Sequence, residues 1–149
     1  MGLLATELRE RGPMPITYSI SRDERLIKAY ATGVIRAVDL HPFLDALLAD
    51  PDLVPGLRGL YDASDAAPDI TVLQLAEVAT RVVHVVNRGL GRIAIVAKLS
   101  ATYRVAKTFA VLARALGTDV EVFTEHRAAE AWLEEVRGSG DTGETPLPR

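Results

Sequence analysis

The 149-residue sequence contains no cysteine, which excludes disulfide bonds, thiolate metal ligands and cysteine nucleophiles. Aromatic residues make up only 5% of the chain and apolar residues 48%, so the core must be built mainly from Ala, Val, Leu and Ile. No apolar run approaches the roughly 20 residues of a membrane-spanning helix, and residues 1–13 lack the apolar stretch of a secretory signal. We therefore expect a single cytoplasmic domain without a transmembrane segment.

Acidic residues are absent from residues 78–118, a stretch that carries seven Lys and Arg side chains. This stretch has a charge of +7, whereas the whole chain has a charge of −3 and the other 108 residues together carry −10. Such separation of charge within one small domain favours an anionic ligand or an acidic partner near the basic part.

Both ends of the chain have the composition of peripheral segments. Residues 1–13 carry mixed charges and stop at Gly12-Pro13, which predicts an N-terminal arm and leaves Met14 as an alternative start. Residues 138–149 are rich in Gly, Pro and Thr and nearly free of apolar side chains, which predicts a disordered C-terminal tail. The folded domain is expected at residues 14–137.

Strand-like and helix-like periodicities alternate along this domain. Five segments have the pattern of β-strands, namely residues 16–20, 26–32, 58–63, 93–97 and 120–123. The short polar connection between the first two strands predicts an antiparallel hairpin. Four segments have helical periodicity, namely residues 39–49, 71–88, 100–117 and 127–136.

Two helices have residues at their starts that are suited to capping the helix. Thr71 and Gln74 fit a capping box, Val72 begins the apolar stripe of that helix, and Ser100 is the expected cap of the next one. The order β-β-α-β-α-β-α-β-α predicts an α/β fold with a mostly parallel sheet of about five strands and an antiparallel N-terminal edge hairpin.

Three stretches of this pattern resemble the STAS superfamily, and more closely its SpoIIAA-like branch. GRIAIVA at residues 91–97 is similar to the central strand of that fold. DVEVF at residues 119–123, followed by AAEAWL at residues 128–133, is similar to its last strand and helix. The resemblance covers residues 16–136. It implies a non-enzymatic protein that works by binding partner proteins, and in other branches small or hydrophobic ligands.

Many STAS proteins are switched by phosphorylation of a serine in an Asp-Ser-Ser-Gly motif at the start of the helix after the third strand. This sequence has Pro68-Asp69-Ile70-Thr71-Val72 at that place, so the motif is missing and only Thr71 offers a hydroxyl group. The resemblance therefore leaves Thr71 as the candidate phosphorylation site. A simple helix cap is the alternative role of Thr71.

Ligands of open α/β sheets gather beyond the carboxyl ends of the strands, which directs attention to residues 62–69, 98–100 and 124–126. Asp62, Ser64 and Asp65 form a polar cluster there that is suited to ligand or partner contacts, or to turn formation. Lys98 and Ser100 stand at the opening of a helix and could hold an anion, although no glycine-rich phosphate loop is present.

Basic side chains on two helices could form one docking surface if the helices are neighbours; they include Arg81, Arg88, Arg104 and Lys107. A solvated helix face is the alternative. The chain is acidic overall and few aromatic residues accompany these cations, so specific nucleic-acid binding is not expected. The three histidines lack metal-ligand spacing, and we expect neither a metal site nor a cofactor.

Two further expectations concern the strands. Tyr30 and Tyr61 fall on strands that are close together, where they either flank a pocket or pack in the core. The second strand places Lys28 and Tyr30 on one face and Ile27 and Ala29 on the other, so a face left uncovered by helices would favour a homodimer.

The sequence thus predicts a non-catalytic STAS-like regulatory module that binds an acidic protein partner through its charged surface. The alternative is a carrier for a small hydrophobic ligand or lipid, which would require an apolar cavity between the elements. An enzyme is not expected, because no convergent acid–base pair is evident in the sequence.

Overall fold

The amino-terminal hairpin forms one edge of the sheet in the computed structural model, which describes residues 10–12 and 14–142, the side chains of 136–142 excepted. Strand β1 (Ile16–Ser21) pairs antiparallel with β2 (Leu26–Ile35), and Ile16 lies opposite Ala31. Arg25 turns the chain between them with a φ of 55°. The predicted antiparallel edge hairpin is confirmed.

The other three strands extend this hairpin into a five-stranded sheet with the order β1-β2-β3-β4-β5. Strand β3 (Leu57–Pro68), strand β4 (Leu90–Val96) and strand β5 (Val120–Phe123) all run parallel to β2. Strand β4 is buried at most of its positions, as expected for a strand covered on both faces. The predicted order of elements and the mostly parallel sheet are both confirmed.

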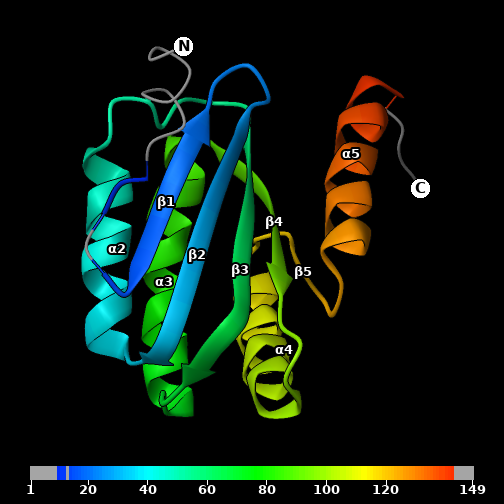
Figure 1. Ribbon diagram of the computed structural model, residues 1–149. Coiled ribbons are helices and arrows are strands. Elements are labelled where there is room, and N and C mark those ends of the chain that lie inside the picture. The colour runs from blue at the N-terminus through cyan, green and yellow to red at the C-terminus, as the bar shows by residue number, and fades with distance from the viewer. Residues whose placement is uncertain (1–9, 13, 143–149) are drawn as a thin grey trace.

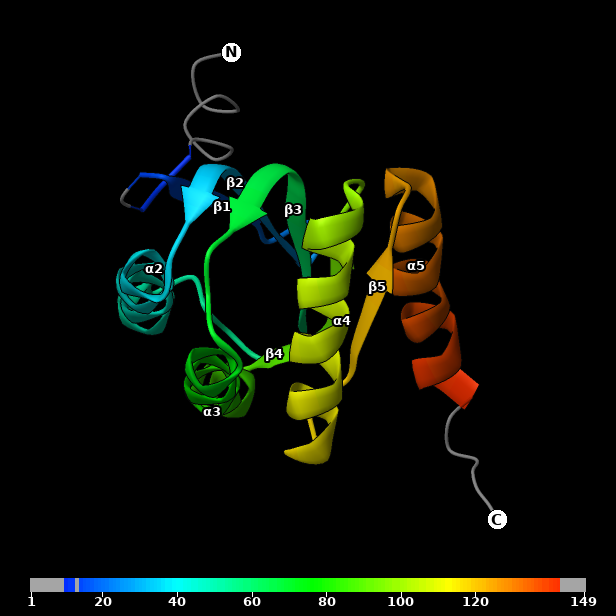
Figure 2. The same cartoon turned by 90° about the horizontal axis from the view of Figure 1, so that it is seen from below.

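Three helices cover one face of the sheet: α2 (Ala37–Ala49), α3 (Val72–Arg88) and α4 (Ser100–Ala115). Each connects two neighbouring parallel strands, and every step runs in the same direction along the sheet. Because such crossovers are right-handed, all three helices must lie on the same side. Figures 1 and 2 show this arrangement, with α5 (His126–Thr142) alone on the opposite side of the sheet.

The apolar core is correspondingly divided in two. The larger part lies between the sheet and helices α2, α3 and α4, with Ile16, Leu57, Val85 and Val120 almost wholly buried. The smaller part lies under α5, where Leu133 and Ala129 pack on the outward side chains of β2, β3 and β4.

Helix α5 leaves the outer face of β1 and part of β2 uncovered. The side chains that point outward there are mostly polar and include Thr17, Ser19 and Lys28. Because polar side chains on an antiparallel edge can face water, this surface does not require a second subunit to cover it. The homodimer stays a prediction.

Two expected boundaries were wrong. The third strand was expected at residues 58–63, but β3 also includes residues 64–68, because a register shift between Tyr30 and Thr32 lets β2 continue pairing as far as Pro68. Helix α5 reaches Thr142, so residues 138–142, expected to be disordered, are helical. A helix gains one hydrogen bond for each added residue, which permits growth beyond its last packed turn. Residues 143–149, and 1–9 and 13 of the arm, lie outside the described residues.

The helix starts follow the expectation for α3 but not for α4. The Thr71 hydroxyl accepts from the Gln74 amide at 3.1 Å and the Gln74 side chain accepts from the Thr71 amide at 2.9 Å, so the predicted capping box is confirmed. Leu99 is the cap residue of α4, because its backbone is extended, and Ser100 is already helical. The prediction of Ser100 as the cap was therefore wrong by one residue.

Candidate functional site

An apolar cavity of about 150 Å³ lies between the inner face of the sheet and helices α2, α3 and α4. Figure 2 shows the ring of elements to which its lining belongs. Large side chains contributed by the helices include Phe43, Leu47, Val82 and Phe109. The sheet contributes mainly smaller or branched side chains from β2, β3 and β4.

Small residues create the space. Ala29 on β2, Ala63 and Ala66 on β3, and Ala106 on α4 all line the cavity and are all buried. Gly59 adds a further position without a side chain. Because protein interiors are otherwise close-packed, a void of this size is a distinct feature of the fold.

Two polar side chains reach the cavity lining, Thr102 and Tyr61. The buried Thr102 hydroxyl donates to the carbonyl oxygen of Ala66 at 2.8 Å. Tyr61 faces inward from β3 and its ring centre lies 6.2 Å from that of Phe43. Of the two tyrosines predicted either to flank a pocket or to pack in the core, Tyr61 lines the cavity, whereas Tyr30 is exposed and donates to Asp65 on the outer face.

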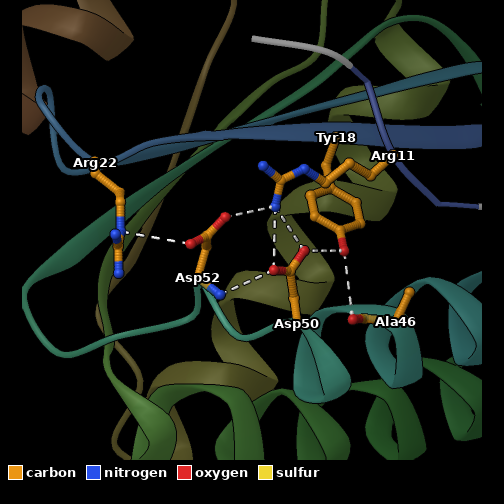
Figure 3. Close-up of polar contacts among 6 residues, drawn as sticks. All are labelled: Arg11, Tyr18, Arg22, Ala46, Asp50 and Asp52. Carbon is orange, nitrogen blue, oxygen red and sulfur yellow. Dashed lines mark hydrogen bonds and ion pairs between the residues drawn. The ribbon is translucent and has the colours of Figure 1, made fainter. Parts of the chain in front are cut away.

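The end of the molecule at the amino termini of the parallel strands is closed by a polar cluster, which Figure 3 shows. Arg11 donates to both oxygens of Asp50, at 3.1 and 3.0 Å, and to Asp52 at 3.1 Å. The buried Tyr18 hydroxyl donates to Asp50 at 2.7 Å, and Arg22 pairs with Asp52 at 3.4 Å. The cluster ties the described part of the N-terminal arm to β1 and to the end of α2.

Electrostatics within this cluster favour the ionised carboxylate. Burial alone would raise the pKa of Asp50, but hydrogen bonds from the Asp52 amide, Tyr18 and Arg11 outweigh it and hold the pKa below its ordinary value. Burial and the nearby Asp50 carboxylate raise the pKa of Tyr18, so its hydroxyl remains a donor.

Backbone contacts close the same end further. Gly89 takes a φ of 143°, and a side chain at this position would meet the Val54 carbonyl oxygen at 2.5 Å. The amides of Gly56 and Leu57 donate to the Gly89 carbonyl oxygen, at 3.1 and 3.3 Å. Only glycine fits where the chain passes so closely over the end of α3.

The opposite end, where helices α2, α3 and α4 begin, exposes several large apolar side chains. Nine large apolar side chains are exposed among the described residues, and six of them belong to this end. These six are Met14, Val34, Val38, Val72, Leu73 and Leu99. Val72, expected to begin the buried stripe of α3, is 63% exposed because it lies in the first turn, beyond the packed part of the helix.

The polar residues predicted after the third strand lie together on the outer face, in β3 itself. Asp62 accepts from the Ser64 amide at 2.9 Å and its other oxygen lies 2.8 Å from Nε2 of His126. Burial alone would raise the pKa of Asp62, but the hydrogen bonds from Ser64 and His126 hold it below its ordinary value. The pairing of Asp62 with His126 was not foreseen, although both positions were placed at the carboxyl edge of the sheet.

The other two predicted polar positions lie apart from that pair. Lys98 and Ser100 are exposed at the start of α4, and Thr71 is exposed at the start of α3. Anion binding at the first two positions and phosphorylation of Thr71 stay predictions.

The predicted basic surface is partly engaged within the molecule. Arg81 pairs with Asp45 of α2 at 2.7 Å, and Arg88 donates to the Leu48 carbonyl oxygen at 2.9 Å. Arg104 and Lys107 are exposed on α4, and within the described part of the chain neither forms an ion pair. The two cations on α3 thus contact α2. On α4, Arg114 pairs with Glu121 at 2.6 Å and Lys107 lies over the Tyr103 ring, while Arg104 and Lys107 remain exposed.

Within residues 10–12 and 14–135, no group of three or more His, Asp or Glu side chains is placed to hold a metal ion. No helix in that part of the chain combines the length and apolar character needed to cross a membrane.

Comparison with solved structures shows the class of fold. The chain is similar to an uncharacterized protein of the DUF3478 family from Shewanella loihica PV-4, which has a SpoIIAA-like fold. The TM-score is 0.53 and the sequence identity 18%, over 79% of this chain and 93% of the other. The fold is therefore SpoIIAA-like, as the sequence predicted. No protein-family model and no curated protein sequence matches the chain.

Proposed function

We propose that this protein binds a small apolar molecule in the cavity between its sheet and helices α2, α3 and α4, and acts as a carrier for it. The cavity of about 150 Å³ is the observation that carries the proposal. An engineered apolar cavity of about this volume in another protein stays dry and takes up benzene. The volume suits a compact molecule with one ring or a short chain, and is far too small for a whole phospholipid.

The energetic cost of the cavity supports a binding role. Core space that no side chain fills forfeits van der Waals contacts and destabilises the fold. A larger residue at Ala63, Ala66 or Ala106 would fill the space. A ligand in the cavity would restore the lost van der Waals contacts and stabilise the fold.

The chemistry of the lining favours binding over catalysis at this place. Among the side chains that line the cavity, Tyr61 is the only one that can ionise, and no second group stands ready to exchange a proton with it. Small-molecule sites are mostly apolar with a few placed polar groups, which fits this lining. The predicted resemblance to STAS branches that hold small ligands points the same way.

The test is chemical analysis of organic-solvent extracts from gently purified protein, compared with extracts of the Ala106→Leu variant. Leucine at this position would occupy the cavity and leave the surface unchanged. The proposal predicts a small apolar compound in near-equimolar amount in the first extract and its loss from the second. The same compound in equal amount in both extracts would contradict it.

A second candidate function is the regulatory module that binds an acidic protein partner, and the exposed Arg104 and Lys107 on α4 favour it. The double change Arg104→Glu and Lys107→Glu should weaken capture of such a partner and leave the fold intact. The matched control is Arg127→Glu, an exposed cation on α5 at the far side of the sheet. Equal loss in the control, or no loss in the double variant, would count against this surface.

A further inference from the structure

Tyr61 is the polar group best placed to select a ligand in the cavity. It stands in the middle of β3, faces α2 and lines the cavity beside Phe43, with the two rings tilted by 48°. Its hydroxyl makes no hydrogen bond to any residue that the structure describes, whereas Tyr18 donates to Asp50 and Tyr30 donates to Asp65.

The surroundings make this hydroxyl a donor that lacks an acceptor. Burial raises its pKa, and the negative charge of Asp39 raises it further, so the group stays protonated. Tyr61 is partly exposed and lines the cavity, so its hydroxyl is available to a molecule bound there. Thr102, the other polar side chain in the lining, already donates to Ala66.

We propose that the ligand of this cavity is a compact apolar molecule that carries one oxygen, in a hydroxyl or carbonyl group, and that the Tyr61 hydroxyl donates a hydrogen bond to this oxygen. The inference rests on the proposed function and adds the chemical class of the ligand. A site that offers one placed donor without a protein partner binds the oxygen-bearing molecule better than the hydrocarbon of the same size.

The experiment compares phenol and toluene, two probes with one ring and the same number of non-hydrogen atoms, by NMR titration of the full chain. The proposal predicts that Tyr61→Phe weakens phenol binding by about tenfold, the value of one buried hydrogen bond, and leaves toluene binding nearly unchanged. Retained toluene binding shows in the same experiment that the variant is folded and its cavity intact. Tyr103→Phe, which lies on α4 outside the lining, should change neither affinity.

The outcomes separate this inference from the proposed function. If the unmodified protein binds toluene and Tyr61→Phe changes the two affinities by the same factor, the carrier function stands and the role of Tyr61 is overturned. If the unmodified protein binds neither probe, both proposals are overturned.

Discussion

Asp50 is the residue on which the closed end of the molecule depends. It follows the last turn of α2, its side chain is 7% exposed, and it accepts from Arg11, Tyr18 and the Asp52 amide. A buried carboxylate that has this many donors favours its ionised form and lowers its own pKa. One side chain thus fixes the start of β1 and the end of α2, which lie far apart in the sequence.

Replacement of Asp50 by Asn should lower the free energy of unfolding by about 2 kcal/mol at neutral pH, because charge-assisted hydrogen bonds are lost. The pKa of Asp50 is lower in the folded state, so its stabilisation is complete above the unfolded value of 3.8 and is lost as the pH falls below it. The deficit of the variant should therefore shrink below about pH 4. Denaturant unfolding at a series of pH values measures this.

The control for this experiment is Asp45→Asn. Asp45 pairs with Arg81 on the surface, where its side chain is 61% exposed, and the loss should be below about 1 kcal/mol. Equal deficits in the two variants, or a deficit for Asp50→Asn that persists in acid, would contradict the assignment of Asp50.

The order of the helices and strands could be predicted from hydrophobic periodicity and turn residues in the sequence. The alternation of strands and helices predicted the mostly parallel sheet. The short polar connection between the first two strands predicted the antiparallel edge hairpin. The extent of β3 could not be inferred, because Asp62, Ser64 and Asp65 are turn-forming residues that continue as a strand only where β2 pairs with them after a register shift. The place of α5 on the opposite face depends on packing by Leu133 and Trp132.

The capping box at the start of helix α3 can be tested by substitution of Thr71. Thr71→Ala should lower the free energy of unfolding by about 1 kcal/mol, because the Gln74 amide loses its acceptor, whereas Thr71→Ser should retain most of the stability. Thermal unfolding of the two variants measures the difference. Equal stability of both variants and the unmodified chain would show that the cap contributes nothing.

The whole molecule is defined by a contrast between its two ends. One end is closed by the Asp50 cluster and by the close contact of Gly89 with Val54, and the other exposes apolar side chains where three helices begin. The cavity lies between these ends. Its existence could not be predicted from the sequence, because Ala63 and Ala106 have the same pattern as well-packed core alanines and only their spatial neighbours distinguish them.

Two alanines on α4 test whether the cavity is real. Ala106 lines it, whereas Ala110, one turn further on, is fully buried and does not. Ala106→Leu should raise the free energy of unfolding by about 1 kcal/mol because it fills space, and Ala110→Leu should lower it by about 1–3 kcal/mol because it overpacks the core. Denaturant unfolding gives both values. Destabilisation of equal size in the two variants would mean that no such space exists.

The central claim is that the cavity holds a small apolar ligand, and calorimetric titration of the protein with toluene tests it most directly. Saturable binding of one toluene molecule to the unmodified chain, together with its loss in Ala106→Leu and its retention in the surface variant Asp45→Asn, is the predicted result. The absence of binding to the unmodified chain, or equal binding to Ala106→Leu, would contradict the claim.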